Sequence, residues 1–351
     1  MQPAQQDGVP QRDDEHFHQT GHPPIMTILQ WGILGTGGIA SQMARAMAEL
    51  DDARLYAVAS REAAKAASFA QTFGAARHYG SYAELVADPA VDAVYIATPH
   101  AQHFDALQLC LTAGKPVLCE KPFTLNAQQA AQAITLAGDQ QVFMMEAMWM
   151  RFIPAIVEAL SLVARGAIGK LQGVQADFGF RQTFDAAHRV FNPALGGGAL
   201  LDIGIYPLSL ACLFLGPIDR IQSMAELGMT GVDEQTAFTL QHAGGGLSTG
   251  WCSLRTPTPT EASLLGSHGT LRLHAPFYCP SQLTLQQQGH APRLISMPIS
   301  GNGYRYELEE VHRCLRLGLL ESPHMPLADT LATLQALDTI RAQIGVRYPV
   351  E

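Results

Sequence analysis

Residues 28–50 read ILQWGIL, GTGGIA and SQMARAMAEL in succession. The first block, Ile28 to Leu34, predicts a buried strand, and the last, Ser41 to Leu50, predicts a helix. Between them, Gly35 to Ala40 makes a tight turn with small residues at its first, third and sixth positions. A strand, a turn of this kind and a helix, in that order, are typical of a dinucleotide-binding fold.

Each position of this turn has a physical task. Gly35 allows the sharp turn, Gly37 lets the backbone approach a pyrophosphate, and Ala40 lets the helix pack closely against the strand. The amino end of the helix then offers free N–H groups and a positive dipole to the phosphates. We therefore predict that the turn binds the cofactor through Gly35, Thr36, Gly37, Gly38 and Ile39.

The end of the second predicted strand indicates which dinucleotide is bound. This strand, Arg54 to Ala59, ends in Ser60-Arg61, where an NAD-binding site usually has a carboxylate for the ribose hydroxyls. The planar fork of an arginine suits a 2′-phosphate. The sequence therefore favours NADP(H) over NAD(H), with Ser60 and Arg61 as ligands. The alternative is an exposed arginine at a helix start beside Glu62.

Lys121 is the first catalytic candidate. Val117-Leu-Cys-Glu-Lys-Pro122 predicts a buried strand that stops at a Glu-Lys pair and a proline. In an open parallel sheet the ligand lies outside the carboxyl ends of the strands, so a lysine placed there points into the crevice. The alternative is a lysine in a surface turn, which is the usual position of lysines.

A neighbouring strand, Ala93 to Ala97, ends in Thr98-Pro99-His100-Ala-Gln-His103. The two histidines lack a carboxylate or a third ligand nearby, so a metal site is not predicted. We expect contacts around the cofactor or substrate instead, and a histidine with a purely structural role is the alternative. The candidates for cofactor binding at these two strand ends are Thr98, Pro99, His100, His103, Glu120 and Lys121.

The composition favours a globular enzyme. The chain has 351 residues, 47% of them hydrophobic and 15% charged, with a net charge of -9, and this length predicts two domains. The acidic balance argues against a nucleic-acid partner. The six cysteines show no C-x-x-C pair or zinc spacing and no secretory signal is recognisable, so we expect reduced thiols, a cytoplasmic location and no metal. The apolar run from Gly198 to Ile218 contains Asp202 and two prolines, which favours a buried helix over a membrane span.

The alternation of elements divides the chain into two domains after a tail. Residues 1–25 carry no apolar period and predict a disordered tail, although His16, His18 and His22 could bind a metal. Strands and helices alternate through residues 26–147, which predicts a doubly wound parallel sheet. Residues 148–351 contain three predicted hairpins followed by two helices, so we expect an α+β domain with a large open, mostly antiparallel sheet. One face of that sheet is expected to pair with a second copy in a homodimer or larger homo-oligomer.

A second catalytic stretch lies in the second domain. Gly196-Gly-Gly-Ala-Leu-Leu-Asp202-Ile-Gly-Ile-Tyr206 combines three glycines, which allow close backbone approach to a ligand, with two polar residues on an apolar helix. Asp202 and Tyr206 are four residues apart and so share one helix face. They are either active-site groups or a buried hydrogen-bonded pair, and the spacing does not distinguish these alternatives. Pro207 makes the helical geometry approximate.

Taken together, these motifs resemble the glucose-fructose oxidoreductase / inositol dehydrogenase / MocA-type family from about Met26 to the end of the chain. The tyrosine at 206, the Ser60-Arg61 pair and the run from Glu146 to Phe152 most resemble the branch of trans-1,2-dihydrobenzene-1,2-diol dehydrogenases and NADP-dependent D-xylose dehydrogenases. The resemblance implies a Rossmann domain, an open sheet that forms the dimer surface, and hydride transfer at a carbinol carbon.

Under this resemblance we expect an NADP-dependent oxidoreductase that acts on a sugar or cyclic diol. The substrate would lie between the nicotinamide, near Lys121, and Tyr206, whose ionised form the lysine favours. Asp202 would orient the substrate hydroxyl or the lysine. Expected wall residues are Trp149, Arg151 and Phe277. The alternatives are an inositol, polyol or amino-sugar dehydrogenase, and a non-catalytic NADP-sensing regulator.

Overall fold

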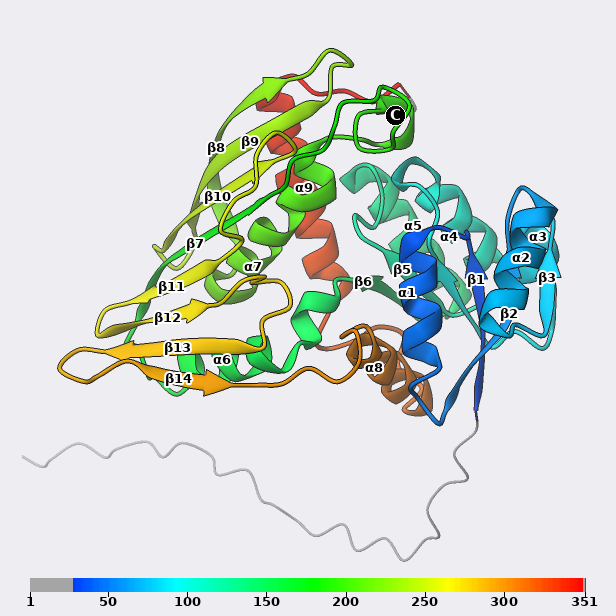
Figure 1. Cartoon of the computed structure of the whole chain (residues 1–351), viewed down its shortest axis with the longest axis horizontal. Coiled ribbons are helices and arrows are strands. Elements are labelled where there is room, and N and C mark those ends of the chain that lie inside the picture. Colours follow the sequence, from blue (N-terminus) through cyan, green and yellow to red (C-terminus); the bar gives the residue numbers. More distant parts are fainter. Residues whose placement is uncertain (1–27, 350) are drawn as a thin grey trace, which may run out of the picture.

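Two β-sheets with helices between them make up the fold of the computed structural model, which describes residues 28–349 and residue 351 (Figure 1). The predicted tail, residues 1–25, lies outside the described residues, and so do His16, His18 and His22. In Figure 1 the strands of the first half of the chain lie on the right and those of the second half on the left.

The first sheet has six strands, all paired in parallel, in the order β3-β2-β1-β4-β5-β6. This order reverses direction between β1 and β4, as in a doubly wound dinucleotide fold, and it confirms the predicted sheet. Strands β4, β5 and β6 are buried at every residue, and their sequences are apolar except for Glu120 in β5 and Glu146 in β6. The strands are β1 (Leu29–Leu34), β2 (Ala53–Ala59), β3 (Arg77–Tyr79), β4 (Ala93–Ile96), β5 (Val117–Glu120) and β6 (Met144–Ala147).

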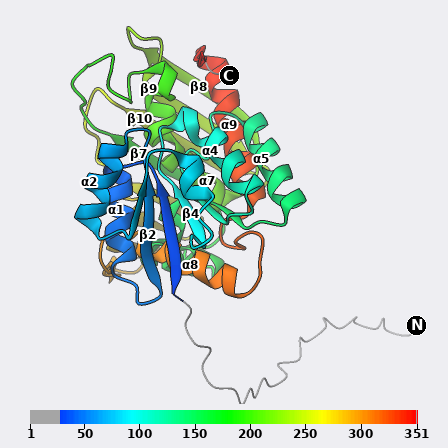
Figure 2. The same ribbon diagram turned by 90° about the vertical axis from the view of Figure 1, so that its right-hand side faces the viewer.

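Helices cover both faces of this sheet, with α1 and α2 on one side and α4 and α5 on the other (Figure 2). Helix α1 begins at Gly38, inside the predicted turn, because Gly37 is its N-cap. Gly35 has φ +107°, and a Cβ there would lie 2.6 Å from the carbonyl oxygen of Ala97, so the turn packs against the end of β4. The helices are α1 (Gly38–Met47), α2 (Ala63–Phe73), α3 (Tyr82–Val86), α4 (His103–Thr112) and α5 (Ala127–Gln140).

The second sheet has eight strands in the order β14-β13-β12-β11-β7-β10-β9-β8. The three predicted hairpins are confirmed as the antiparallel pairs β9/β10, β11/β12 and β13/β14. Only β7 and β10 pair in parallel among the described strands of this sheet, so it is mostly antiparallel as expected. The strands are β7 (Leu171–Gly179), β8 (Ile218–Leu227), β9 (Asp233–His242), β10 (Leu247–Ser253), β11 (Ala262–Gly266), β12 (Gly269–Leu273), β13 (Gln282–Gln287) and β14 (Arg293–Ser296).

Helices pack on one face of the second sheet, between it and the parallel sheet (Figure 1). They are α6 (Pro154–Ala164), α7 (Ile205–Leu215) and α9 (Leu327–Ile344). Helix α8 (Arg305–Arg316) instead returns to the first half of the chain, where the indole Nε1 of Trp31 donates to Nε2 of His312 at 3.0 Å. A division into 26–147 and 148–351 follows the two sheets and remains our proposal, with α8 shared across it.

The apolar run near Gly198 is a core helix of this arrangement. The stretch Pro193–Leu215 is long and apolar enough to cross a membrane, yet 78% of its most apolar window is buried inside the protein. It contains a π-helical segment, Leu200–Gly204, that runs directly into α7. This segment and α7 pack against β7, β9 and β10 of the second sheet.

Candidate functional site

A cleft of about 490 Å³ lies at the carboxyl ends of β1, β2, β4 and β5. The π-helical segment and α7 close it from the second half of the chain. All the predicted cofactor-binding residues line this cleft, together with Asp202 and Tyr206. These cofactor candidates are Gly35, Thr36, Gly37, Gly38, Ile39, Ser60, Arg61, Thr98, Pro99, His100, His103, Glu120 and Lys121.

The glycine turn leaves space and hydrogen-bond donors for a pyrophosphate. A Cβ at Gly37 or Gly38 would meet nothing within 4 Å. The N-cap of α1 has no side-chain acceptor and its first turn has no acidic residue, so the first N–H groups stay available to an anion. The hydroxyl of Thr98 is buried in the same cleft without a partner. These features fit a dinucleotide.

Arg61 is free to bind a phosphate at the far end of the cleft. Glu62 pairs with Lys65, Nζ to Oε1 at 2.6 Å, rather than with Arg61. Within residues 28–349, Arg61 takes part in no ion pair. Lys65, which was not predicted as a site residue, also lines the cleft. Arg61 and Lys65 are therefore two cations on the cleft wall, and within the described residues only Lys65 has a carboxylate partner.

Lys121 reaches across the cleft to the second half of the chain. Its Nζ donates to the main-chain carbonyl of Asp202 at 2.7 Å and lies 3.6 Å from Oδ1 of the same residue. A π-helix would pair that carbonyl with the N–H five residues later, at Pro207, which has none. The proline therefore leaves this carbonyl available to the lysine, which is a local reason for the convergence of the two halves.

Three side chains surround the carboxylate of Asp202: the ammonium of Lys121, the guanidinium of Arg189 and the imidazole of His100. Arg189 donates to both oxygens, at 2.9 and 3.2 Å, while Nε2 of His100 lies 4.0 Å from Oδ1. Burial alone would raise the pKa of Asp202, but Lys121 and then Arg189 hold it well below its usual range. Asp202 is therefore an anion in the cleft, and Arg189 occupies both of its oxygens.

Tyr206 is a neutral phenol in the described structure. Burial raises the pKa of its hydroxyl well above the usual value, Tyr304 and Glu120 add to the rise, and a hydrogen bond from Trp149 opposes it. The Nζ of Lys121 lies 4.9 Å from the ring centroid, over the ring face rather than beside the oxygen. The indole Nε1 of Trp149 donates to the phenol oxygen at 2.9 Å, so the phenol can give its own proton to another acceptor.

Aromatic rings pack around the phenol of Tyr206. Trp149 stacks on Tyr304 with centroids 4.2 Å apart, and Tyr278 lies 5.2 Å from Tyr206 and 4.7 Å from Phe178. Of these rings, only Tyr206 and Tyr304 are among the residues that line the cleft.

None of the three expected wall residues is among those that line the cleft, although Trp149 contacts Tyr206. Phe277 is fully buried in the core, and its neighbour Tyr278 faces Tyr206 instead. Arg151 points away from the cleft and pairs with Asp329 of α9 at 2.7 Å. Sequence position alone could not show these directions, because a one-residue step in an irregular segment reverses the side chain.

The two histidines contact main-chain carbonyl groups of the loops around the cleft. His103 is fully buried, with Nδ1 2.8 Å from the carbonyl of Pro122 and Nε2 2.9 Å from that of Thr98. It thus joins the ends of β4 and β5. His100 contacts the carbonyl of Gly196 at 2.9 Å, and burial lowers its pKa to about 3. These contacts match a purely structural role for both histidines, although both residues also line the cleft.

Glu120 is buried under Lys121. Its carboxylate accepts from the hydroxyl of Tyr95 and from the backbone N–H of Lys121. Burial raises the pKa of Glu120, and the nearby ammonium of Lys121 opposes that rise. Both oxygens are thus used within the protein, which fixes the turn at the end of β5 rather than contacting a substrate.

The three glycines at 196–198 approach the protein itself rather than a ligand. A Cβ at Gly196 would lie 2.7 Å from Leu125, and one at Gly197 would lie 2.8 Å from the carbonyl of Arg189. Gly198 has φ +116°, and a Cβ there would collide with Asp233. These glycines were expected to let the backbone come close to a ligand. In the structure they let it come close to other parts of the chain.

Two groups that surround the site could not be recognised from the sequence. Arg189 lies in the irregular segment between β7 and the π-helical segment, and Tyr304 lies just before α8. Neither belongs to a periodic pattern, and each comes next to its partner only through the tertiary fold.

Comparisons with known proteins agree with this geometry. Residues 29–148 match the family described as an oxidoreductase family with an NAD-binding Rossmann fold, and residues 156–272 match the GFO/IDH/MocA C-terminal domain. The chain is 38% identical to a trans-1,2-dihydrobenzene-1,2-diol dehydrogenase of Danio rerio over 91% of this chain and 98% of that protein.

Solved structures share the whole fold. The aldose-aldose oxidoreductase of Caulobacter crescentus, solved with glycerol, is 25% identical with a TM-score of 0.81, over 90% of this chain and 97% of that one. A 3-ketoreductase of Actinomadura kijaniata, solved with NADP and TDP-benzene, is 23% identical with a TM-score of 0.82, over 91% of this chain and 98% of that one.

Proposed function

The chain belongs to the oxidoreductase family with the NAD-binding Rossmann fold and the GFO/IDH/MocA C-terminal domain, and from this we propose that it transfers hydride between NADP and a carbinol carbon of a cyclic diol or sugar. One observation carries the proposal. Lys121 from the parallel sheet meets Asp202 and Tyr206 from the other half of the chain in the cleft that the glycine turn opens.

NADP is the proposed cofactor because the cleft supplies what its phosphates need. The amino end of α1 would hold the pyrophosphate, and Arg61 with Lys65 would hold the 2′-phosphate. When bound, this cofactor would take hydride from the carbinol carbon or return it. The same residues can also bind NAD, but without a partner for Arg61.

The residues around Tyr206 support a ring-shaped alcohol as substrate. The aromatic rings of Tyr206 and Tyr304, which line the cleft, would cover the apolar face of a diol or sugar ring. The phenol of Tyr206 would hydrogen-bond the reacting oxygen, and Lys121 would stabilise negative charge on it. The relative of Danio rerio, which is a diol dehydrogenase, supports the cyclic diol first.

Proton transfer assigns roles to the two groups. In carbonyl reduction the neutral phenol of Tyr206 would give its proton to the oxygen, because Trp149 already occupies its acceptor side. Diol oxidation is the reverse, and it requires that the phenol lose a proton before it accepts one from the substrate. Asp202 would keep Lys121 in position through the carbonyl contact at 2.7 Å.

A panel of alcohols tests the function. NADP+ is supplied with cyclic trans-diols, pentoses, hexoses, inositols and amino-sugars, and formation of NADPH is followed by its fluorescence. Turnover with a diol or an aldose supports the proposal, and turnover with inositol or amino-sugars alone would select the alternative substrate class. Tight NADP+ binding without turnover of any alcohol would favour a regulatory protein.

Replacement of Arg61 by alanine tests the cofactor assignment. The Michaelis constant for NADP+ is expected to rise at least tenfold, since a charge-assisted bidentate contact to a phosphate is lost. The constant for NAD+ should stay within about twofold. Arg54→Ala, on strand β2 before Arg61, is the matched control and should change neither. Equal loss for both cofactors would show that Arg61 does not contact the 2′-phosphate.

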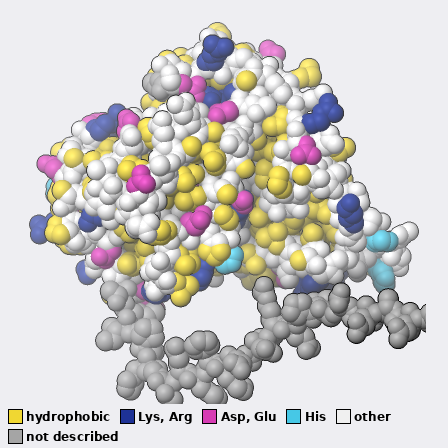
Figure 3. Space-filling view, turned by 180° about the vertical axis from the view of Figure 1, so that it is seen from behind, with side chains coloured by type: hydrophobic (Ala, Val, Ile, Leu, Met, Phe, Trp, Pro, Cys, Tyr) yellow, Lys and Arg dark blue, Asp and Glu magenta, His cyan; other side chains and the backbone are white. Residues whose placement is uncertain are grey.

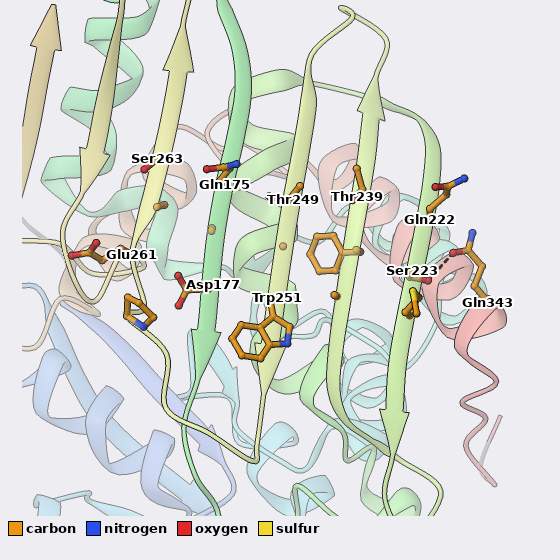
Figure 4. Close-up of a pocket in the computed structure, with 17 residues that line it drawn as sticks. Gln175, Asp177, Gln222, Ser223, Thr239, Thr249, Trp251, Glu261, Ser263 and Gln343 are labelled. Carbon is orange, nitrogen blue, oxygen red and sulfur yellow. Dashed lines mark hydrogen bonds between the residues drawn. The ribbon is translucent and has the colours of Figure 1, made fainter.

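We further propose that the open face of the second sheet binds a second copy of the chain. Figure 4 shows this face, where Trp251 lies near Asp177. The polar side chains of Thr239 on β9 and Thr249 on β10 lie side by side on it. Trp251 is 38% exposed and Met224 is 80% exposed. A broad face with an exposed Trp and Met on one side, and helices only on the other, suits a subunit interface.

The oligomer can be tested by Trp251→Arg, which places a charge in the middle of this face. We expect the wild-type chain to elute with about twice the mass of one chain in light scattering, and the variant to shift to a single chain. Leu317→Arg, at an exposed site after α8, is the control and should stay associated. A wild-type chain of monomeric mass at micromolar concentration would refute this surface assignment.

The remaining expectations concern partners and location. On the face seen in Figure 3, basic and acidic side chains are interspersed rather than gathered into one basic region. All six cysteines are free, and burial raises the pKa of the thiols of Cys110 and Cys212 to about 12. These features support a cytoplasmic enzyme that acts on small molecules, without a nucleic-acid or membrane partner.

A further inference from the structure

A buried carboxyl group from the second sheet holds the start of the helix that carries the site. Asp233, the first residue of β9, is 1% exposed. Its Oδ2 accepts from the backbone N–H of Leu200 and from the hydroxyl of Thr236, both at 2.7 Å. Leu200 is the first residue of the π-helical segment. Its N–H has no acceptor within the helix, so Asp233 supplies one through space.

The same carboxyl group packs against the turn before the helix. Gly198 can pass beside Oδ1 of Asp233 only because it has no side chain. One residue earlier, the hydroxyl of Tyr348 donates to the carbonyl of Gly197 at 2.6 Å. Two groups that are distant in sequence thus fix the backbone on both sides of Gly198, just before Leu200.

This anchor lies two residues from Asp202. A shift of the first turn would move the carbonyl of Asp202 away from Lys121, with which it makes a 2.7 Å contact. The same shift would turn Tyr206 relative to Trp149. Reaction rates depend steeply on such positions, and an error of about 1 Å can cost roughly a hundredfold.

We propose that Asp233 is a positioning residue that sets Asp202 and Tyr206 relative to Lys121 without touching substrate or cofactor. The inference rests on the function proposed above and adds the group that organises its site. Asp233 does not line the cleft, so its effect must pass through Leu200 and the helix.

The charge of Asp233 gives the anchor a pH dependence. Burial raises its pKa to about 6, while Thr236 and Leu200 oppose the rise. The other titratable or charged groups that face it are Arg341, Tyr348 and Cys252. Above this pH the carboxylate accepts both hydrogen bonds. Below it one oxygen carries a proton, and Oδ1 has no acceptor to receive it.

Activity and stability should therefore respond to pH in opposite directions. Above pH 6 the ionised carboxylate of Asp233 holds the start of the helix, so turnover should be higher there. A carboxyl group whose pKa is raised on folding stabilises the fold fully below its usual value of 3.8, and this contribution is lost as the pH rises through about 6. A residue with only a structural role would not separate the two readouts in this way.

Two substitutions test the proposal. Asp233→Ala removes the acceptor, and we expect turnover to fall roughly 10- to 100-fold while the dissociation constant of NADP+ stays within about twofold. Asp233→Asn can keep both hydrogen bonds through its amide oxygen and place its NH2 where Oδ1 lies. Because this NH2, like the proton of the acid form, has no acceptor there, the variant should turn over at pH 8 no faster than the wild type does below pH 6, and it should lose the fall in activity near pH 6. Asp219→Ala, an exposed carboxylate on β8, is the control.

Hydrogen exchange gives a readout that needs no substrate. In the unliganded chain, Asp233→Ala should exchange faster over residues 199–206, and Asp233→Asn should resemble the wild type below pH 6. The wild-type melting temperature, relative to that of Asp233→Asn, should fall between pH 5 and pH 8. The proposal would be overturned if Asp233→Ala had the turnover and exchange rates of the wild type. It would also be overturned if the activity of Asp233→Asn still fell near pH 6. A wild-type chain that turns over no alcohol in the panel counts against the proposed function instead.

Discussion

Replacement of Lys121 by alanine is expected to lower turnover by roughly 10²- to 10⁴-fold, the usual effect of losing a positioned catalytic group. The ammonium is the only cation that reaches from the parallel sheet to Asp202 within the described cleft, donating to its carbonyl at 2.7 Å. Without it, developing negative charge on the substrate oxygen has no cation beside it. Steady-state rates with NADP+ and the preferred alcohol measure the loss.

Two further variants separate charge from packing. Lys121→Met fills most of the same space without the ammonium and should lose as much turnover as the alanine variant. Lys170→Ala removes an exposed lysine before β7 and should leave the rate unchanged. The dissociation constant for NADPH, measured by fluorescence, should change by less than about threefold in all three. Near-normal turnover in Lys121→Met would show that the ammonium takes no part in the reaction.

Replacement of Tyr206 by phenylalanine removes one oxygen atom and should also cost roughly 10²- to 10⁴-fold in turnover. The ring stays, so the contacts with Tyr278 and Phe178 are retained. What is lost is the proton donor, together with the acceptor for the indole N–H of Trp149 at 2.9 Å. Tyr56→Phe, on β2, is the control and should keep full turnover.

The direction of the Tyr206 pKa shift adds a pH signature. Burial holds the phenol neutral, so the proton-accepting form that alcohol oxidation needs is scarce at neutral pH. Below the pKa this fraction grows about tenfold for each pH unit, so oxidation by the wild type should accelerate steadily into the alkaline range. Tyr206→Phe should lose that slope. The same slope in both would assign the alkaline dependence to another group.

The fold could be predicted almost completely from local patterns. The glycine turn after β1 and the apolar runs of β4 and β5 led to a doubly wound sheet, and period-two runs led to the three hairpins. Strands β3 and β8 were not predicted. In β8 the less exposed positions alternate from Ile221 to Ala225, but they include Ser223 while Met224 faces outward, so the sequence shows no apolar alternation.

The ionisation of the site could not be predicted in the same way. Lys121 was expected to favour the ionised form of Tyr206, whereas burial and the nearby Glu120 hold the phenol neutral. The lysine lies over the ring face, where it interacts with the π-system more than with the oxygen. Sequence spacing placed the two residues together without showing their orientation, and the pKa depends on the orientation.

The sequence by itself determined where the site lies, because the carboxyl ends of parallel strands meet at one edge and the residues at those ends can be read in order. It also determined that Asp202 and Tyr206 belong to one apolar helix. Only the tertiary structure decided what these groups contact: Arg189 on the carboxylate, Trp149 on the phenol and Asp233 at the helix start. Periodicity records which side of an element is buried. It does not record which group lies opposite, and that group sets charge, direction and proton affinity.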